Sequence, residues 1–163
     1  MVLREVYIDG ACRHNGHPNA VGAAAAVFRN RRGVSDTKVA VLPDHPRPTN
    51  QRAELRAIIL ALEEALDKYD SLFSSPVLNL NIYSDSRYAV RCMDEWIRKW
   101  SRNGWRNSSG GEVVNRDLME EAYDLEDRVR GVGTVMYQWI PRSENEEADA
   151  AVNNILDEAE GSL

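Results

Sequence analysis

The sequence predicts a single α/β domain in which a five-stranded mixed sheet is flanked by helices. Two observations lead to this prediction. Three extended segments follow one another at the N-terminus, and two later strands are each followed by a segment with helical periodicity. This order of elements favours a three-stranded antiparallel meander joined by two parallel strands. No internal repeat, linker or low-complexity segment interrupts residues 1–163, so we expect one domain.

The composition is typical of a globular protein. Of the 163 residues, 43% are hydrophobic and 28% are charged, and no apolar stretch approaches the ~20 residues of a membrane span. The net charge of −6 argues against a general polyanion binder, so any nucleic-acid contact needs a local basic patch. The start of the chain has no secretory pattern, and Cys12 and Cys92 are too few for a disulfide framework. We therefore expect an intracellular monomer, cytoplasmic or nuclear, with no membrane contact and no obligate protein partner.

The first predicted strand, Val2–Ala11, carries an acid in the middle of an apolar run. An uncompensated charge there costs on the order of several kcal/mol, so Asp9 is either a salt-bridged acid or a metal ligand. The segments Ala20–Asn30 and Val34–Leu42 are predicted as the next two strands, joined by a turn at residues 31–33. The small residues of the middle strand leave room for a helix to pack closely.

A long helix is predicted from Asn50 to Asp70, because Thr49 or Asn50 can cap it and its apolar residues recur with helical spacing. Glu54 lies beside this apolar stripe, in the first turns. An acid there is equally well explained as a surface residue favoured by the helix dipole.

The rest of the chain alternates strand and helix. Two further acids stand at element ends, Asp85 directly after a strand and Asp149 beside the apolar face of the last helix. In open α/β sheets, ligands bind at the carboxyl ends of the strands. The predicted strands are Val77–Ser84 and Gly133–Ile140. The predicted helices are Ser86–Asn103, which divides into two pieces, a helix capped by Asn115, and a last helix opened by a capping box at Ser143–Glu146.

The element order brings together four acids: Asp9, Glu54, Asp85 and Asp149. Four clustered carboxylates repel one another unless cations lie between them, and hard divalent cations such as Mg²⁺ take oxygen ligands. Two such ions ~4 Å apart can activate a water and stabilise the leaving oxygen of a phosphodiester. Other chemistries find little support, because the sequence has no Gly-x-Ser-x-Gly motif, no Walker loop and no Cys/His pairing.

Four motifs resemble those of type 1 ribonuclease H, in order and over nearly the whole chain. They are Tyr7–Cys12, Thr49–Leu55, Tyr83–Tyr88 and Asn145–Asp149. The resemblance implies a ribonuclease H-like fold and an endonuclease that cuts the RNA strand of RNA–DNA hybrids. It also implies that Asp9, Glu54, Asp85 and Asp149 are the catalytic ligands of two Mg²⁺ ions, with Mn²⁺ as an alternative.

The resemblance also implies which residues contact the hybrid. Cys12, Asn15, Asn50 and Gln51 match positions that touch the RNA strand around its 2′-hydroxyls, and Thr49 matches a position that helps hold a DNA phosphate. Asn15 and Asn50 also fit as ordinary turn and cap residues, and Cys12 as a small buried filler.

The segment Trp96–Arg106 resembles the family's basic protrusion. Between Arg87 and Arg106 the chain has six basic and two acidic residues, whereas Glu112–Arg128 has seven acidic and two basic ones. Basic side chains near aromatic faces suit a nucleic-acid backbone. We expect Trp96 to pack in a helical subcore and the DNA strand to meet Arg98, Lys99, Trp100, Arg102, Trp105 and Arg106.

One feature departs from the well-known members of the family. They carry a histidine in a longer loop before the last helix, whereas here no histidine follows His45, as in a short form of the family. Arg142 is the nearby cation that could neutralise phosphate charge in its place, or it is a solvated helix-start residue. The alternative to an enzyme is a non-catalytic binding or scaffold domain with the same fold, which the presence of all four acids disfavours.

Overall fold

The computed structural model describes residues 1–161, whose five strands form one mixed sheet in the order β3-β2-β1-β4-β5. The first three strands are antiparallel, β4 runs parallel to β1, and β5 runs parallel to β4. This topology confirms the predicted fold class. The strands are β1 (Val2–Arg13), β2 (Val21–Asn30), β3 (Gly33–Val41), β4 (Leu78–Ser84) and β5 (Gly133–Trp139).

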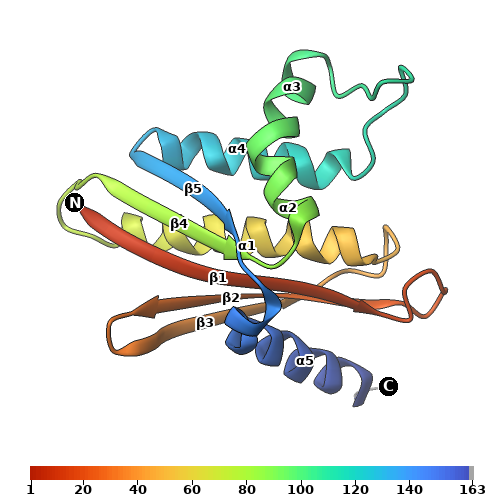
Figure 1. Ribbon diagram of the computed structural model, residues 1–163, viewed down its shortest axis with the longest axis horizontal. Coiled ribbons are helices and arrows are strands. Elements are labelled where there is room, and N and C mark those ends of the chain that lie inside the picture. The colour runs from red at the N-terminus through yellow and green to blue at the C-terminus, as the bar shows by residue number, and fades with distance from the viewer. Residues whose placement is uncertain (162–163) are drawn as a thin grey trace.

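Helices cover both faces of the sheet (Figure 1). The long helix α1 (Asn50–Asp70) packs on β1 and β2 with α4 (Arg116–Arg130) beside it, whereas α5 (Glu146–Gly161) lies on the opposite face over β1, β2 and β3. The bounds of α1 agree with the prediction. Among residues 1–161, none of the helices combines the length and the hydropathy that a membrane span requires.

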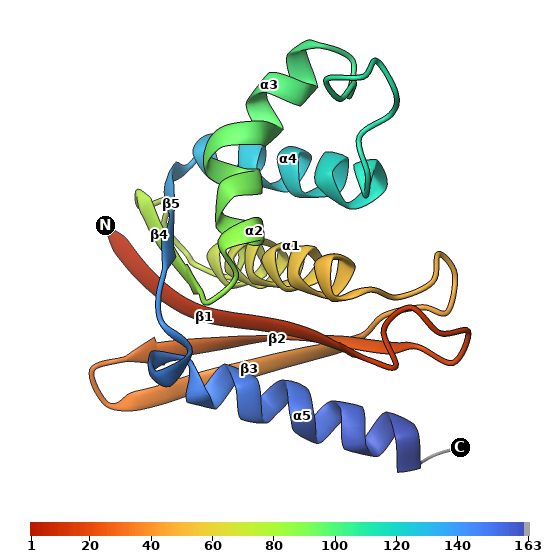
Figure 2. The same ribbon diagram turned by 45° about the vertical axis from the view of Figure 1, so that its right-hand side comes forward.

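A bent helical arm stands away from the sheet after β4 (Figure 2). It consists of α2 (Arg87–Arg91), a π-helical turn (Cys92–Trp96) and α3 (Ile97–Arg102). The predicted division into two pieces therefore has a specific cause, a wider turn inserted into the helix. Gly104, with φ +76°, follows the end of α3, as the predicted stop at Asn103-Gly104 requires.

The small residues of β2 allow helices to pack on both of its faces. Ala24, Ala26 and Phe28 join the large core that contains α1, and Ala23 and Ala25 join a small second core with α5. The second core contains only two buried helix residues among those described, Val152 and Leu156. As predicted, the small residues of β2 let a helix pack closely on this strand, and they do so on both of its faces.

Gly10 allows α1 to approach β1 unusually closely. A Cβ atom at this position would lie 2.2 Å from the backbone oxygen of Ala53 and 2.6 Å from the backbone nitrogen of Glu54. The glycine therefore supplies space where the strand that carries Asp9 meets the helix turn that carries Glu54.

Two predicted helix caps were wrong. Ser143 does not open the last helix, because residues 142–144 form a 3₁₀ turn and α5 begins only after Asn145. Asn115 does precede α4, but its backbone is left-handed (φ 64°) and its side chain makes no capping bond. Its amide instead donates to the hydroxyl of Tyr88 (3.2 Å). At Asn115, a hydrogen bond to the distant Tyr88 thus takes the place of a capping bond to α4.

Candidate active site

The fold brings the four predicted acids together where β1 and β4 lie side by side. Asp9 projects from β1, and Asp85 directly follows β4. Glu54 comes from the second turn of α1, and Asp149 from the first turn of α5 on the other face. Neighbouring parallel strands and two helix starts therefore supply one carboxylate each.

The electrostatics of this group show that the carboxylates are close. Burial raises the pKa of Asp9 from 3.8 to about 7, and the negative charges of Asp85 and Asp149 contribute to this rise. Burial also raises the pKa of Glu54, with Asp85 adding to the effect. Mutual repulsion in a partly dry site is the situation that divalent cations relieve, and four carboxylates are a donor set that fits Mg²⁺ or Mn²⁺.

The side chains do not converge on a single point. Among residues 1–161, no three His, Cys, Asp or Glu side chains are arranged so that they could share one metal ion. Glu54 is turned toward the hydroxyl of Ser86, which donates to its Oε2 atom (2.6 Å), and Asp85 lies 3.9 Å from Nε of Arg142. Binding a cation between the acids therefore requires their side chains to turn.

Ser86 is a site residue whose role the sequence reasoning missed. Besides donating to Glu54, its Oγ atom accepts from the backbone N–H of Ala89 (3.0 Å) and so caps α2. A serine between a strand-end acid and a helix is a recognisable cap signal. The bond to Glu54, 32 residues away, had no such signal in the sequence.

Asn145 is a second missed residue, and it ties α5 to β1. Its side chain is buried, with the residue 1% exposed, and its Nδ2 atom donates to the backbone oxygen of Ile8 (2.8 Å). Its backbone oxygen accepts from the N–H of Asp149 (3.1 Å). One buried residue thus connects the peptide before Asp9 to the turn that carries Asp149.

We expect Asn145→Ala to lower the free energy of unfolding by about 1–3 kcal/mol, because a buried carbonyl loses its donor. Cleavage of a hybrid should fall further than this loss explains, since the position of Asp149 relative to Asp9 is released. Chemical denaturation and initial rates at a temperature where both proteins are folded would measure the two effects. Asn154→Ala, at an exposed position of α5, is the control. An Asn145→Ala variant with wild-type stability and full activity would contradict the positioning role.

Three of the residues predicted to contact RNA form a hydrogen-bonded chain. The backbone N–H of Cys12 donates to Oδ1 of Asn50 (3.0 Å), and the backbone N–H of Asn50 donates to Oδ1 of Asn15 (3.2 Å). Thr49 caps α1 by accepting from the N–H of Arg52 (3.1 Å), and Gln51 is exposed beside it. The amide groups Nδ2 of Asn15 and Asn50 are thereby oriented and carry no bond to another described residue.

The four basic residues predicted to contact DNA are accessible to solvent. Of the two tryptophans predicted to contact DNA, one is buried. Arg98, Lys99 and Arg102 are exposed on α3, and Arg106 is exposed in the segment that follows it. None of the four forms an ion pair within residues 1–161. Trp100 is half-buried against Trp96, with ring centroids 5.6 Å apart. Trp105 is only 8% exposed and packs edge-on against Tyr123, which does not fit the predicted contact with DNA. We therefore leave Trp105 out of the interface.

A buried arginine fixes the start of α1 against α4. Arg52 donates to both carboxylate oxygens of Asp117 (2.9 and 2.7 Å), and its Nη1 atom also donates to Asn115 (3.4 Å). The arginine lowers the pKa of Asp117 by these hydrogen bonds and its charge. The turn that carries Asn50 and Glu54 is therefore also held by α4.

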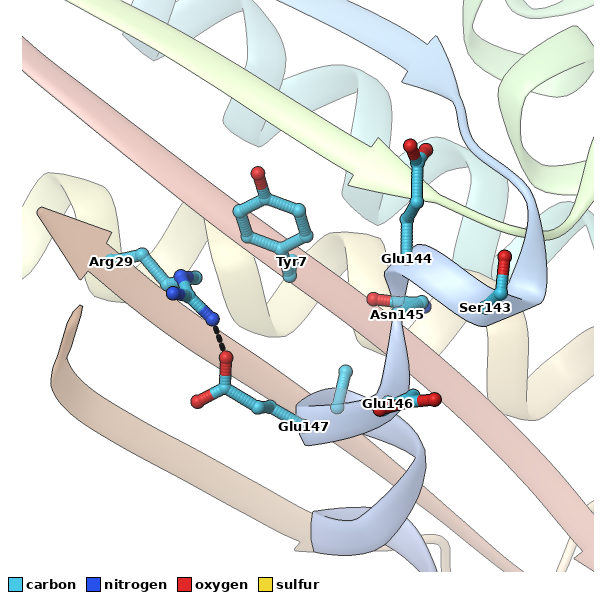
Figure 3. A pocket seen from close by; sticks show the side chains of 8 residues that line it. Tyr7, Arg29, Ser143, Glu144, Asn145, Glu146 and Glu147 are labelled. Carbon is cyan, nitrogen blue, oxygen red and sulfur yellow. Dashed lines mark ion pairs between the residues drawn. The ribbon is translucent and has the colours of Figure 1, made fainter.

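A small pocket beside Asn145 is separate from the carboxylate group (Figure 3). Tyr7, Arg29 and Glu144 line it, and Arg29 forms an ion pair with Glu147 across it. None of Asp9, Glu54, Asp85 and Asp149 is among the described residues that line this pocket. Its acids therefore do not add to the candidate metal site.

Comparisons with known proteins agree on one family. A family model described as RNase H matches residues 3–156. A protein named ribonuclease H from Pelobacter propionicus is 33% identical over 161 residues, covering 96% of this chain and 86% of that protein. A second, from Halorhodospira halophila, is 33% identical and covers 94% and 93%.

Solved structures show the same fold. The crystal structure of LC11-RNase H1 in complex with an RNA/DNA hybrid superposes with a TM-score of 0.71 at 22% identity, covering 96% of this chain and 98% of that one. RNase H1 from the archaeon Halobacterium salinarum superposes with a TM-score of 0.64 at 24% identity, covering 96% and 99%. At these identities the likeness concerns the fold.

Proposed function

The chain belongs to the ribonuclease H family, and we propose that it hydrolyses the RNA strand of RNA–DNA hybrids with two divalent cations held by Asp9, Glu54, Asp85 and Asp149. The observation that carries this proposal is the grouping of four carboxylates, with the pKa of Asp9 raised to about 7. A scaffold domain without turnover has no need for four acids that destabilise one another. The bound ions, Mg²⁺ or Mn²⁺, would supply the activated water and the charge stabilisation of the leaving oxygen.

The protein side chains have separate tasks in this proposal. Asp9 is the central ligand, because it is the acid influenced by both Asp85 and Asp149. Ser86 holds Glu54 until the carboxylate turns toward a cation. Asn15 and Asn50 present oriented amides to the RNA 2′-hydroxyls, which act as donor and acceptor and so distinguish RNA from DNA. Arg142, whose side chain is 88% exposed, adds positive charge beside Asp85.

One assay tests the proposal. Labelled RNA–DNA hybrid, duplex DNA and duplex RNA are incubated with the protein and Mg²⁺, Mn²⁺ or EDTA. We expect internal cuts in the RNA strand of the hybrid with either metal and none with EDTA. A protein that binds the hybrid but leaves it intact with every divalent metal is the scaffold domain instead. The same samples, run on a sizing column, test the expected monomer.

Four basic residues, Arg98, Lys99, Arg102 and Arg106, should bind the DNA strand through its phosphates. We expect the combined replacement of Arg98, Lys99, Arg102 and Arg106 by Ala to weaken hybrid binding and flatten its salt dependence, by about 0.9 in slope for each phosphate that the variant no longer binds. The cleavage rate at saturating hybrid should be retained. Binding titrations at several salt concentrations measure the slope.

The control for this fourfold variant is Arg31→Ala with Arg32→Ala, which removes positive charge from the exposed β2–β3 turn. If the fourfold variant and this control change the salt slope equally, the four residues act only through the net charge of the protein.

A further inference from the structure

The guanidinium of Arg87 lies over an aromatic ring next to Asp85, one of the four acids. Its guanidinium carbon is 3.9 Å from the ring centroid of Trp139, the last residue of β5. The indole is itself fixed, because its Nε1 atom donates to the backbone oxygen of Asp85 (3.1 Å). A planar cation is therefore held in a defined place next to one of the four carboxylates.

Within the described part of the chain, no acid pairs with Arg87. Arg87 is exposed and takes part in no ion pair within residues 1–161. Arg91, one turn later, differs in this respect: it also lies over a tryptophan, Trp96 (5.5 Å), but pairs with Glu95 (3.5 Å). A guanidinium that contacts a ring can still donate its N–H groups, and their planar arrangement matches the oxygens of a phosphate.

The order of the strands indicates which phosphate Arg87 can reach. Cys12 lies at the end of β1, the acids lie where β1 meets β4, and Trp139 ends β5 on the far side of β4. An RNA strand that is held near Cys12, Asn15 and Asn50 and cut at the acids continues toward β5. Arg87 and Trp139 lie at this end of the path, beyond the acids as seen from Cys12.

We propose that Arg87, held by Trp139, binds the RNA-strand phosphate adjacent to the scissile one, on the side away from Cys12. This subsite rests on the proposed function, because it uses the same substrate and the same path across the acids. It gives the protein a second fixed point on the RNA strand. The two points lie on opposite sides of the carboxylates, so together they set which phosphodiester lies between them.

The test uses a hybrid with one defined cleavage region. A DNA strand with a short central ribonucleotide stretch is paired with complementary DNA, and single phosphates are made neutral as methylphosphonates, one per substrate, in either strand. Wild type, Arg87→Ala and Arg91→Ala are compared on each. We expect Arg87→Ala to lower kcat/KM about tenfold on the fully charged substrate, as for loss of a hydrogen bond to a charged group. Arg91→Ala should behave as wild type.

The decisive result is non-additivity. One neutral linkage in the ribonucleotide-containing strand, next to the cut, should slow wild type about as much as Arg87→Ala does, and should slow Arg87→Ala no further. The proposal would be overturned if every neutral linkage lowered the kcat/KM of Arg87→Ala by the same further factor. It would also be overturned if the effects were non-additive only for neutral linkages in the complementary DNA strand.

Binding in EDTA separates this outcome from failure of the proposed function. There, Arg87→Ala should reduce the salt slope by about 0.9 while Arg91→Ala leaves it unchanged, whether or not wild type cleaves. A slope unchanged in Arg87→Ala would also overturn the subsite. If the salt slopes of wild type and Arg87→Ala differ as expected but the wild type never cleaves the hybrid, the subsite stands and the proposed activity is wrong.

Discussion

Asp9→Asn is expected to abolish hybrid cleavage while making the metal-free protein more stable. The amide is a poor ligand for a hard cation and removes the acid that is coupled to both Asp85 and Asp149. It also removes a charge that is partly buried among like charges. We expect the free energy of unfolding to rise by about 1–2 kcal/mol at pH 8, a value reduced to allow for screening by solvent near the acids. Tm should rise by a few degrees. Thermal melts in EDTA and cleavage assays in Mg²⁺ measure the two effects.

The stability that Asp9→Asn gains over wild type should increase with pH. The pKa of Asp9 is raised from 3.8 to about 7 on folding, so between these values the folded protein holds a proton that the unfolded chain has released. The wild type therefore loses stability as pH rises through this range, and the penalty is complete above it. Asn carries no charge, so the advantage of Asp9→Asn should be small near the lower end of this range and full above its upper end.

Asp117 supplies a control of opposite sign. Its pKa is lowered by Arg52, so its contribution to stability is present at neutral pH and is lost as pH falls through its folded-state pKa. Asp117→Asn should therefore destabilise the protein at neutral pH and matter less in acid. A large loss of stability in Asp9→Asn at alkaline pH would mean that Asp9 is a structural acid, and the metal-ligand assignment would be wrong.

Gly10→Ala is expected to cost both folding and activity. The added methyl group would lie 2.2 Å from the backbone oxygen of Ala53, and neither β1 nor α1 can yield by rotating a side chain. We expect a loss of about 3 kcal/mol, the upper part of the usual range for overpacking. The helix must move away at Ala53-Glu54, and a displacement of ~1 Å near reacting groups lowers rates about 100-fold.

Gly161→Ala is the matched control, because a Cβ at this position of α5 would have none of the other described residues within 4 Å. Its stability should stay within about 0.5 kcal/mol of wild type. Denaturant unfolding and cleavage rates of the folded fraction separate the two effects of Gly10→Ala. If the Gly10→Ala variant had wild-type stability, the close approach of α1 to β1 would be contradicted.

The elements that the sequence predicted well are those governed by short-range patterns. The alternation of β4 and the helical stripe of α1 placed both elements within a residue of their observed bounds. The grouping of Asp9, Glu54, Asp85 and Asp149 followed from the element order and the family motifs, because parallel neighbours and helix starts determine where such acids lie.

What the sequence did not predict depends on contacts between distant residues. The bond from Asn145 to Ile8 spans 137 positions, and a capping box at Ser143 looked equally good locally. Trp105 stands among basic residues, and only the packing of Tyr123 from α4 shows that its ring is buried. The pairing of Arg87 with Trp139 requires that β5 end beside β4.

The unequal anchoring of α5 has a consequence for the motions of the folded protein. Its start is fixed by the buried bond from Asn145 to Ile8 and by Ala148. Among the described residues beyond Leu156, Asp157 and Glu160 form ion pairs with Arg13 (2.7 and 3.1 Å), and Glu160 also pairs with His14 (3.2 Å). Such pairs contribute little and weaken with salt. Backbone amide exchange should therefore be graded along α5, slow near Asp149 and fast toward residue 161, with added salt accelerating only the far end. The turn that carries the fourth acid thus stays in place while the end of α5 beyond Leu156 opens and closes.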